Sequence, residues 1–132
     1  MTKKLIKIKR ALISLSNKEN SKKLSDILLK YNIEVLSTGG TAKILTKHKL
    51  KTIEVSSYTN FPEIMEGRVK TLHPKIHGGI LARDQIKKHK QAMSLHSIKK
   101  IDLVVVNLYP FQEISSKNNS TNSLASRLLR PN

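Results

Sequence analysis

Short apolar runs separated by polar segments mark the first third of the chain. Residues 10–16 form an apolar run that is too short for a helix and predicts a buried strand. Residues 21–31 carry apolar side chains at the spacing of one helix face, at Leu24, Ile27, Leu28 and Tyr31. Asn32 then tolerates the left-handed backbone with which many helices end. The pattern predicts a strand followed by an amphipathic helix.

The same alternation continues to residue 107. It predicts further strands over residues 33–37, 52–55 and 102–107, and helices over residues 42–48, 76–83 and 85–96. The last strand is a continuous run of leucine and valine, which indicates burial on both faces, as in a parallel sheet. Residues 56–75 are predicted to be an irregular loop. A loop of that length is usually functional or disordered, and its mixture of aromatic, apolar and charged side chains favours function.

Strands that alternate with helices predict the α/β class, with a doubly wound and mostly parallel sheet joined by right-handed crossovers. Ligands of such sheets bind at the carboxyl ends of the strands. This rule places three segments along one edge of the predicted sheet, namely residues 16–18, 38–41 and 107–109.

The composition limits the class of protein. The chain of 132 residues is long enough for one compact domain, and 38% of its residues are hydrophobic, which can supply a core. It contains no cysteine, which excludes disulfides and cysteine metal sites. No apolar run approaches the roughly 18 residues that span a membrane, and lysines interrupt residues 1–10 too often for a signal peptide. We therefore expect a cytoplasmic protein with no membrane partner.

The net charge of +16 raises the question of a nucleic-acid partner. Lysine far outnumbers arginine, whereas arginine is the better residue for bidentate phosphate contacts. Only 4% of the residues are aromatic, which argues against base-stacking surfaces. The lysines are scattered along the chain, so most of them are predicted to be solvated. Nucleic-acid binding stays the weaker alternative.

Two segments at the predicted edge have features of a phosphate site. Residues 38–41 (TGGT) are predicted to form a turn whose glycines allow close backbone approach, with the positive end of a helix after it. Ser16, Asn17 and Lys18 follow the first strand in the same way. Each segment also has a plain structural interpretation, as an ordinary strand-to-helix turn or as a helix cap.

Residues 67–74 (GRVKTLHP) combine several groups with possible chemistry. In an extended segment Arg68 and Lys70 would point to the same side, where they would clamp a phosphate or polarise a carbonyl. His73 is either an acid–base group or a residue that fixes the loop before Pro74. His73 and His77 are four residues apart, but Pro74 interrupts the helix between them and no carboxylate supports them, so no metal is predicted.

The end of the last predicted strand also carries candidate groups. The side-chain amide of Asn107 can form hydrogen bonds with a carboxamide or with the edge of a purine. The phenol of Tyr109 can donate a hydrogen bond to an oxyanion. The structural alternative is that Pro110 ends the strand and the aromatic residues pack at the edge of the sheet.

Four motifs in this order resemble a known family. They are Ser37–Thr41, Tyr58–Glu63, Gly67–Leu81 and Val106–Phe111. Over residues 10–111 the chain is similar to the bifunctional purine-biosynthesis enzyme AICAR transformylase/IMP cyclohydrolase. The family's amino-terminal domain has a methylglyoxal-synthase-like fold and closes formyl-AICAR (FAICAR) to IMP with loss of water. The resemblance implies that the ligand is a purine nucleotide monophosphate and that no cofactor is needed. A homodimer is possible.

The resemblance also implies site residues. The nucleotide would be held by Ser16, Asn17, Lys18, Thr38, Gly39, Gly40 and Thr41. The site would be lined by Arg68, Val69, Lys70 and Thr71, and the base would meet Val106 and Asn107. Lys70 and Tyr109 would lie beside the reacting groups as the catalytic residues.

The chain departs from the family at two places. Asn17 stands where the family usually has aspartate. After residue 111 the family continues to an Asp-Ile-Gly-Gly motif and a later lysine, its main proton-transfer pair, and neither motif occurs here. We therefore expect an incomplete cyclohydrolase domain over residues 1–114, with little or no activity, and a disordered polar tail over residues 115–132. The alternative is a non-catalytic remnant that still binds the nucleotide.

Overall fold

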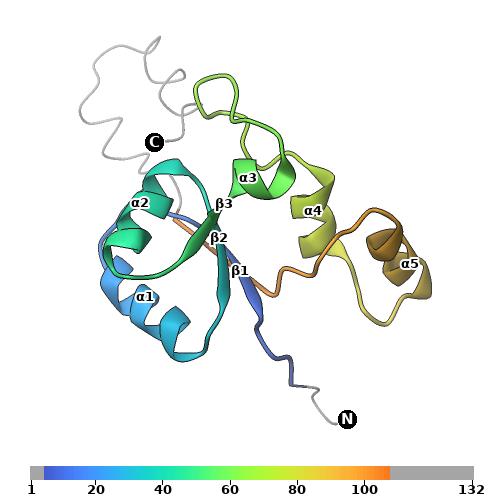
Figure 1. The fold of residues 1–132 in the computed structure, drawn as a ribbon. Helices are drawn as coiled ribbons and strands as arrows, with labels where there is room; N and C mark the ends of the chain where they lie inside the picture. Colours follow the sequence, from blue (N-terminus) through green and yellow to red (C-terminus); the bar gives the residue numbers. More distant parts are fainter. Residues whose placement is uncertain (1–4, 108–132) are drawn as a thin grey trace, which may run out of the picture.

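A computed structural model of the chain describes residues 5–107, which form an α/β fold around one sheet (Figure 1). The strands are β1 (Arg10–Ser14), β2 (Glu34–Ser37), β3 (Thr52–Glu54) and β4 (Leu103–Val106). They pair in the order β3-β2-β1-β4, and every pair is parallel. The predicted class and the parallel sheet are confirmed.

Helices connect these strands. They are α1 (Ser21–Lys30), α2 (Gly39–Lys47), α3 (Val55–Thr59), α4 (Pro74–Leu81) and α5 (Lys87–Leu95). The left-handed backbone predicted after the first helix is confirmed, since Asn32 has a φ of 52°. No helix in residues 5–107 is long and apolar enough to span a membrane.

Two predictions about local structure are wrong. Residues 39–41 are not a turn, because the helix after β2 already begins at Gly39. Residues 56–75 are not wholly irregular, because they contain most of α3 and a short antiparallel bridge between Ile64 and Val69. Both deviations come from tertiary packing, which local periodicity does not report.

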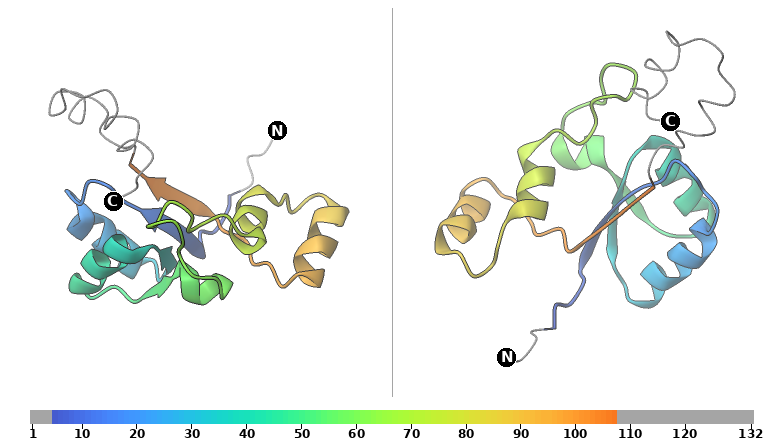
Figure 2. Two further views of the ribbon diagram at one scale, coloured as in Figure 1. Left: turned by 90° about the horizontal axis from the view of Figure 1, so that it is seen from above. Right: turned by 180° about the vertical axis from the view of Figure 1, so that it is seen from behind.

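Helices lie on both sides of the sheet (Figure 2), and the sheet separates two apolar clusters, as expected for a doubly wound fold. Alternate residues of β1 and β2 point to opposite faces, so Ile13 and Val35 pack with α1 and α2. Leu12 and Leu36 pack on the other face with Val55 of α3 and with α4. The burial of this two-sided core holds the carboxyl ends of the strands in fixed positions.

Strand β4 corrects a further prediction. We expected burial on both faces, but Val104 is 42% exposed and Val106 is 56% exposed. β4 pairs only with β1 among the described strands, so it is an edge of the sheet. Leu103 and Val105 pack against the cluster beneath α1 and α2, whereas the opposite face of the strand is open.

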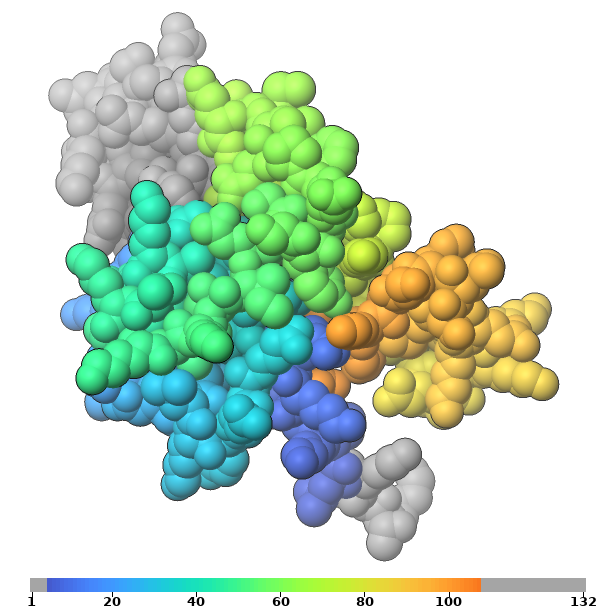
Figure 3. Space-filling model, viewed as in Figure 1, coloured from blue at the N-terminus to red at the C-terminus, as the bar shows by residue number. Residues whose placement is uncertain are grey.

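Helix α5 stands away from the sheet (Figure 1), and the yellow-to-orange part of the chain that contains it projects from one side of the molecule (Figure 3). None of its residues is buried. A helix with so little apolar contact gains little stability from packing and depends on its connections to α4 and β4.

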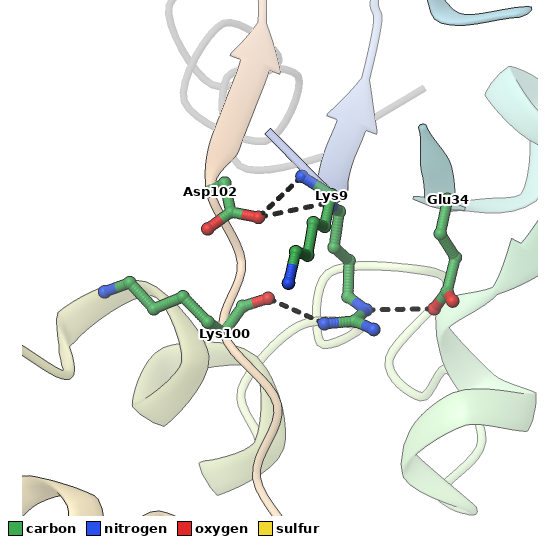
Figure 4. Close-up of polar contacts among 5 residues, drawn as sticks. Lys9, Glu34, Lys100 and Asp102 are labelled. Carbon is green, nitrogen blue, oxygen red and sulfur yellow. Dashed lines mark hydrogen bonds and ion pairs between the residues drawn. The ribbon is translucent and has the colours of Figure 1, made fainter. Parts of the chain in front are cut away.

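A polar network around Arg10 lies at the amino-terminal ends of the strands (Figure 4). The Asp102 carboxylate accepts hydrogen bonds from the backbone N–H groups of Lys9, at 2.9 Å, and of Arg10, at 3.2 Å. The Arg10 guanidinium bonds Glu34 Oε1 at 2.9 Å and the Lys100 carbonyl at 2.8 Å. Groups from the starts of β1, β2 and β4 are thereby tied together.

Tyr58 of α3 lies close to this network. Burial is the main cause that raises the pKa of its phenol. The positive charge of Arg10 acts to lower this pKa, and the negative charge of Glu34 acts to raise it. The phenol therefore stays neutral at physiological pH and acts as a packing residue beside Leu12 and Leu36.

Candidate nucleotide site

The parallel sheet brings the ends of β1, β2 and β4 to one edge, as the topology rule predicts. Residues 15–18 follow β1, α2 follows β2, and Asn107 follows β4. Hydrogen bonds join residues 15–18 to α2 and to Asn107. The predicted convergence of these residues is therefore present in the structure.

Thr38 and Thr41 fasten α2 to the end of β1. The hydroxyl of Thr41 accepts a hydrogen bond from the backbone N–H of Leu15 at 3.0 Å. The hydroxyls of Ser14 and Thr38 lie 3.4 Å apart. Thr38 is 4% exposed and Thr41 is 3% exposed, so these side chains are enclosed by the protein. These contacts join α2 to the end of β1, and the binding role expected of both hydroxyls stays a prediction.

Asn17 and Asn107 join the ends of β1 and β4. The backbone N–H of Asn17 donates to Asn107 Oδ1 at 3.3 Å. The Asn17 side chain in turn accepts from the backbone N–H of Glu19 at 2.8 Å. An aspartate oxygen would accept the same hydrogen bond from Glu19. Asparagine in place of the family's aspartate at position 17 therefore changes the charge and keeps this hydrogen bond.

The start of α2 has the features of an anion site. The Thr38 side chain makes no capping hydrogen bond, which leaves the first amides of the helix open to another acceptor. Lys18 lies alongside, because a methyl group placed on Gly40 would meet Lys18 Nζ at 4.0 Å. The Lys18 ammonium also donates to the Leu15 carbonyl at 2.8 Å, which holds it near the edge.

Ser37, the last residue of β2, was missed by the sequence reasoning. Its hydroxyl is fully buried and, among the residues that the structure describes, it is the one buried side-chain polar atom without a hydrogen-bond partner. Such a group carries a desolvation cost. The signal in the sequence was a serine ending an apolar strand immediately before the glycine pair.

A turn over residues 64–69 brings further side chains close to the start of α2. Ile64 and Val69 exchange backbone hydrogen bonds of 3.0 and 3.2 Å across it. Met65, Glu66 and Gly67 all have positive φ angles, of 55°, 58° and 81°. A left-handed backbone is costly for the two residues with a Cβ, and such conformations are common at functional sites.

The turn places Glu63 and Lys70 together. A methyl group on Gly67 would lie 3.7 Å from Glu63 Oε2 and 3.8 Å from Lys70 Nζ. A methyl group on Gly39 would lie 3.9 Å from Glu63 Oε1. The Glu63 carboxylate therefore stands between the start of α2 and the turn. Sequence reasoning missed Glu63, because its position depends on the left-handed backbone of the turn.

The other residues of this segment occupy different positions. Arg68 belongs to the turn and is exposed, so the extended geometry that would align it with Lys70 is not present. Val69 is half-buried in the bridge with Ile64. Thr71 is half-buried, and its carbonyl accepts a hydrogen bond of 2.8 Å from the backbone N–H of His73.

His73 serves as the amino-terminal cap of α4. Its Nδ1 accepts a hydrogen bond from the backbone N–H of Lys75 at 3.1 Å, and Pro74 is the first residue of the helix. Of the two predicted roles, this contact supports the one that fixes the loop. Residues 5–107 hold no group of three or more histidine, cysteine, aspartate or glutamate side chains that could bind a metal.

The remaining predicted residues follow β1 or lie at and beyond the end of β4. Ser16 lies two residues after β1 and is half-buried. Val106 is the last residue of β4 and is more than half exposed. Tyr109, the predicted boundary at residue 114 and the predicted tail over residues 115–132 fall outside the described residues.

Comparison with known proteins identifies relatives of this chain. It is 55% identical over 114 residues to the bifunctional purine biosynthesis protein PurH of Neisseria meningitidis serogroup C, which covers 86% of this chain and 22% of the relative. It is 51% identical over 112 residues to PurH of Agrobacterium fabrum, which covers 85% of this chain and 21% of that protein. The chain thus spans about a fifth of the length of these relatives.

A solved structure and a family model agree with these matches. The crystal structure of ForH is similar with a TM-score of 0.69 and 33% identity, over 76% of this chain and 51% of that one. The resemblance to the bifunctional purine-biosynthesis family is therefore confirmed. The model of the MGS-like domain matches residues 20–128, most of the chain. The chain belongs to the MGS-like domain family.

Proposed function

We propose that the carboxyl edge of the sheet binds a purine nucleotide monophosphate, as in an IMP cyclohydrolase. The observation that carries the proposal is the uncapped, glycine-lined start of α2, with Lys18 on one side and Lys70 near Gly67 on the other. Amides at a helix start and flanking lysines are suited to a phosphate dianion. The names of the relatives, which refer to purine biosynthesis, support the choice of a purine.

The reaction proposed for this site is closure of FAICAR to IMP. The carboxamide nitrogen attacks the formyl carbon and forms the new C–N bond. The formyl oxygen leaves as water, with one proton from the carboxamide nitrogen and one from the formamido nitrogen. No oxidant and no cofactor enter this balance.

The residues proposed for the site contribute mainly by positioning. A phosphate held at α2 and a base held near Asn107 bring the two reacting groups together, and proximity can supply much of the rate. Lys70 stabilises the negative charge that develops on the formyl oxygen. Tyr109 is proposed for the same oxygen.

A Gly40→Val substitution tests the binding proposal. The added side chain covers the amides at the start of α2, and a Cβ at this position makes only ordinary contact with Lys18, so the fold should persist. Because hydrogen bonds to a charged group contribute about 1.5–3 kcal/mol, we expect IMP affinity to fall on the order of tenfold to a hundredfold in calorimetry.

Thr46→Val is the matched control, because Thr46 is an exposed residue further along the same helix. It should bind IMP as the unchanged chain does. Equal IMP affinity for the Gly40→Val variant and the unchanged chain would falsify the assignment of the phosphate to α2.

A non-catalytic nucleotide-binding domain is the second candidate, and Asn17 is the observation that favours it. A neutral amide stands where the family usually has a carboxylate. Both candidates require IMP binding, and only the first requires turnover of FAICAR. Competition by DNA with a steep salt dependence would instead indicate a nucleic-acid-binding protein.

A further inference from the structure

The Glu63 carboxylate lies beside the proposed phosphate position. One carboxylate oxygen lies beside Gly39 at the start of α2, and the other lies beside Gly67. Lys18 approaches the same helix start at Gly40, and Lys70 approaches Gly67. The negative charge of Glu63 thus lies between two lysines that come from different parts of the chain.

The backbone fixes Glu63 in this position. It directly precedes Ile64, whose bridge to Val69 closes the left-handed turn. In an antiparallel pair the residues next to a bridge face each other, so Glu63 lies opposite Lys70. The position of the carboxylate is therefore a property of the turn.

A carboxylate at the start of a helix is stabilised by the same amides and the same helix dipole that stabilise a bound phosphate. The two anions cannot share this position without repulsion. Two unit charges about 4 Å apart repel even in bulk water by an energy that corresponds to about fivefold in a binding constant.

We infer that Glu63 is an internal competitor for the phosphate position, and that it is a specificity-determining residue of the site. A phosphate that binds at the start of α2 is repelled by this carboxylate, whereas a neutral ligand meets no such repulsion. The inference rests on the proposed function, because it requires that a phosphate binds at α2.

The test is a Glu63→Gln substitution in the full chain, with three probes measured by calorimetry at low salt. IMP and inorganic phosphate carry the competing charge, whereas inosine has the same base and ribose as IMP without the phosphate. We expect the variant to bind IMP and inorganic phosphate about fivefold more tightly, and to bind inosine as before. Added salt should shrink the gain, because the interaction is electrostatic and exposed.

Asp84→Asn is the matched control. It removes one negative charge at the opposite edge of the sheet, near Lys100 and Asp102. It should leave the affinities for IMP and phosphate unchanged, which separates a local effect of Glu63 from a change in net charge.

Unfolding supplies a further readout. In the absence of ligand, Glu63→Gln should not raise the melting temperature, because the helix start loses its internal anion. With saturating phosphate the variant should show a larger increase in melting temperature than the unchanged chain.

The outcomes separate the two proposals. If the unchanged chain binds IMP and the Glu63→Gln variant binds it no more tightly, the inference about Glu63 is wrong and the proposed function stands. An equal gain for inosine also overturns the inference, since it indicates a structural effect. If neither protein binds IMP or phosphate, the proposed function fails and the inference with it.

Discussion

At the scale of single residues, Thr41 shows that a side chain at a binding edge can serve the fold. Its hydroxyl accepts from the Leu15 N–H and lies 3.4 Å from the Leu15 carbonyl oxygen, to which it donates. These contacts span 26 positions in the sequence. They set the position of α2 relative to the end of β1, so the shape of the proposed phosphate site depends on them.

A Thr41→Val substitution should therefore lower stability. Valine keeps the shape but leaves the buried Leu15 N–H without its acceptor, which costs about 1–3 kcal/mol of unfolding free energy. Urea denaturation of both proteins measures the difference. Thr46→Val removes a hydroxyl that bonds the Ala42 carbonyl on an exposed part of the same helix, and it should change stability by no more than about 0.5 kcal/mol. Equal losses for the two variants would contradict this account.

At the scale of elements, two adjacent glycines of α4, Gly78 and Gly79, pack against the segment that leads into β4. A methyl group on Gly79 would lie 2.6 Å from the Lys99 carbonyl oxygen, which belongs to the backbone. A methyl group on Gly78 would lie 2.9 Å from Ile98 Cδ1, the end of a flexible side chain. The Ile101 N–H also donates to the Gly79 carbonyl at 2.9 Å, so this contact leaves no room for movement.

These two glycines give a matched pair of variants. Gly79→Ala should destabilise the chain by about 1–3 kcal/mol, because the backbone of α4 or of residues 99–101 must move. Gly78→Ala should cost less, since Ile98 can change rotamer and alanine favours the helix by up to about 1 kcal/mol. Chemical denaturation of both variants is the measurement. A Gly78→Ala variant less stable than Gly79→Ala would show that this packing is misread.

Periodicity predicted β1, α1 and β2 closely, because in those segments the apolar face of each element and its local ends agree. It failed where packing decides the outcome. A run of valines fits a central strand and an edge strand equally well, so the open face of Val104 and Val106 was not foreseen. Glycines after a strand fit a turn and a helix start equally well, so the beginning of α2 was misplaced.

The candidate site was predictable in its outline. The rule that parallel strands end at one edge foretold the convergence of Lys18, α2 and Asn107. It could not distinguish a hydroxyl that faces a ligand from one that joins two segments, as in Thr41. Nor could it find Glu63, because three successive left-handed residues have no signal in a pattern of apolar and polar positions.

At the scale of the whole molecule, we predict that the 132-residue chain turns over FAICAR slowly or not at all. Positioning groups such as Lys18, Lys70 and Asn107 are present. A polypeptide of residues 1–132 does not contain the Asp-Ile-Gly-Gly motif that the resemblance implies for proton transfer, so this assay tests the positioning groups by themselves. General acid–base groups contribute about 10² to 10⁴ in rate each, so positioning alone should leave at most slow turnover.

The measurement is the formation of IMP from FAICAR by the purified chain, with a full-length PurH relative as reference. The Gly40→Val variant supplies the background rate without proper binding. A rate near that of the full-length relative would mean that groups within this chain carry the proton transfers. A homodimer and a cytoplasmic location stay predictions that this assay does not address.

The open face of β4 has a consequence for the handedness of the fold. From β1 through β2 to β3 the chain moves in one direction across the sheet, and α1 and α2 cover one face. On the return to β4 it moves in the other direction, and α3 and α4 cover the opposite face. Connections between parallel strands are right-handed, so any strand added outside β4 would be reached across this second face. Val104 and Val106, whose β1 partners are Leu12 and Ser14, mark the surface that such a connection would cover.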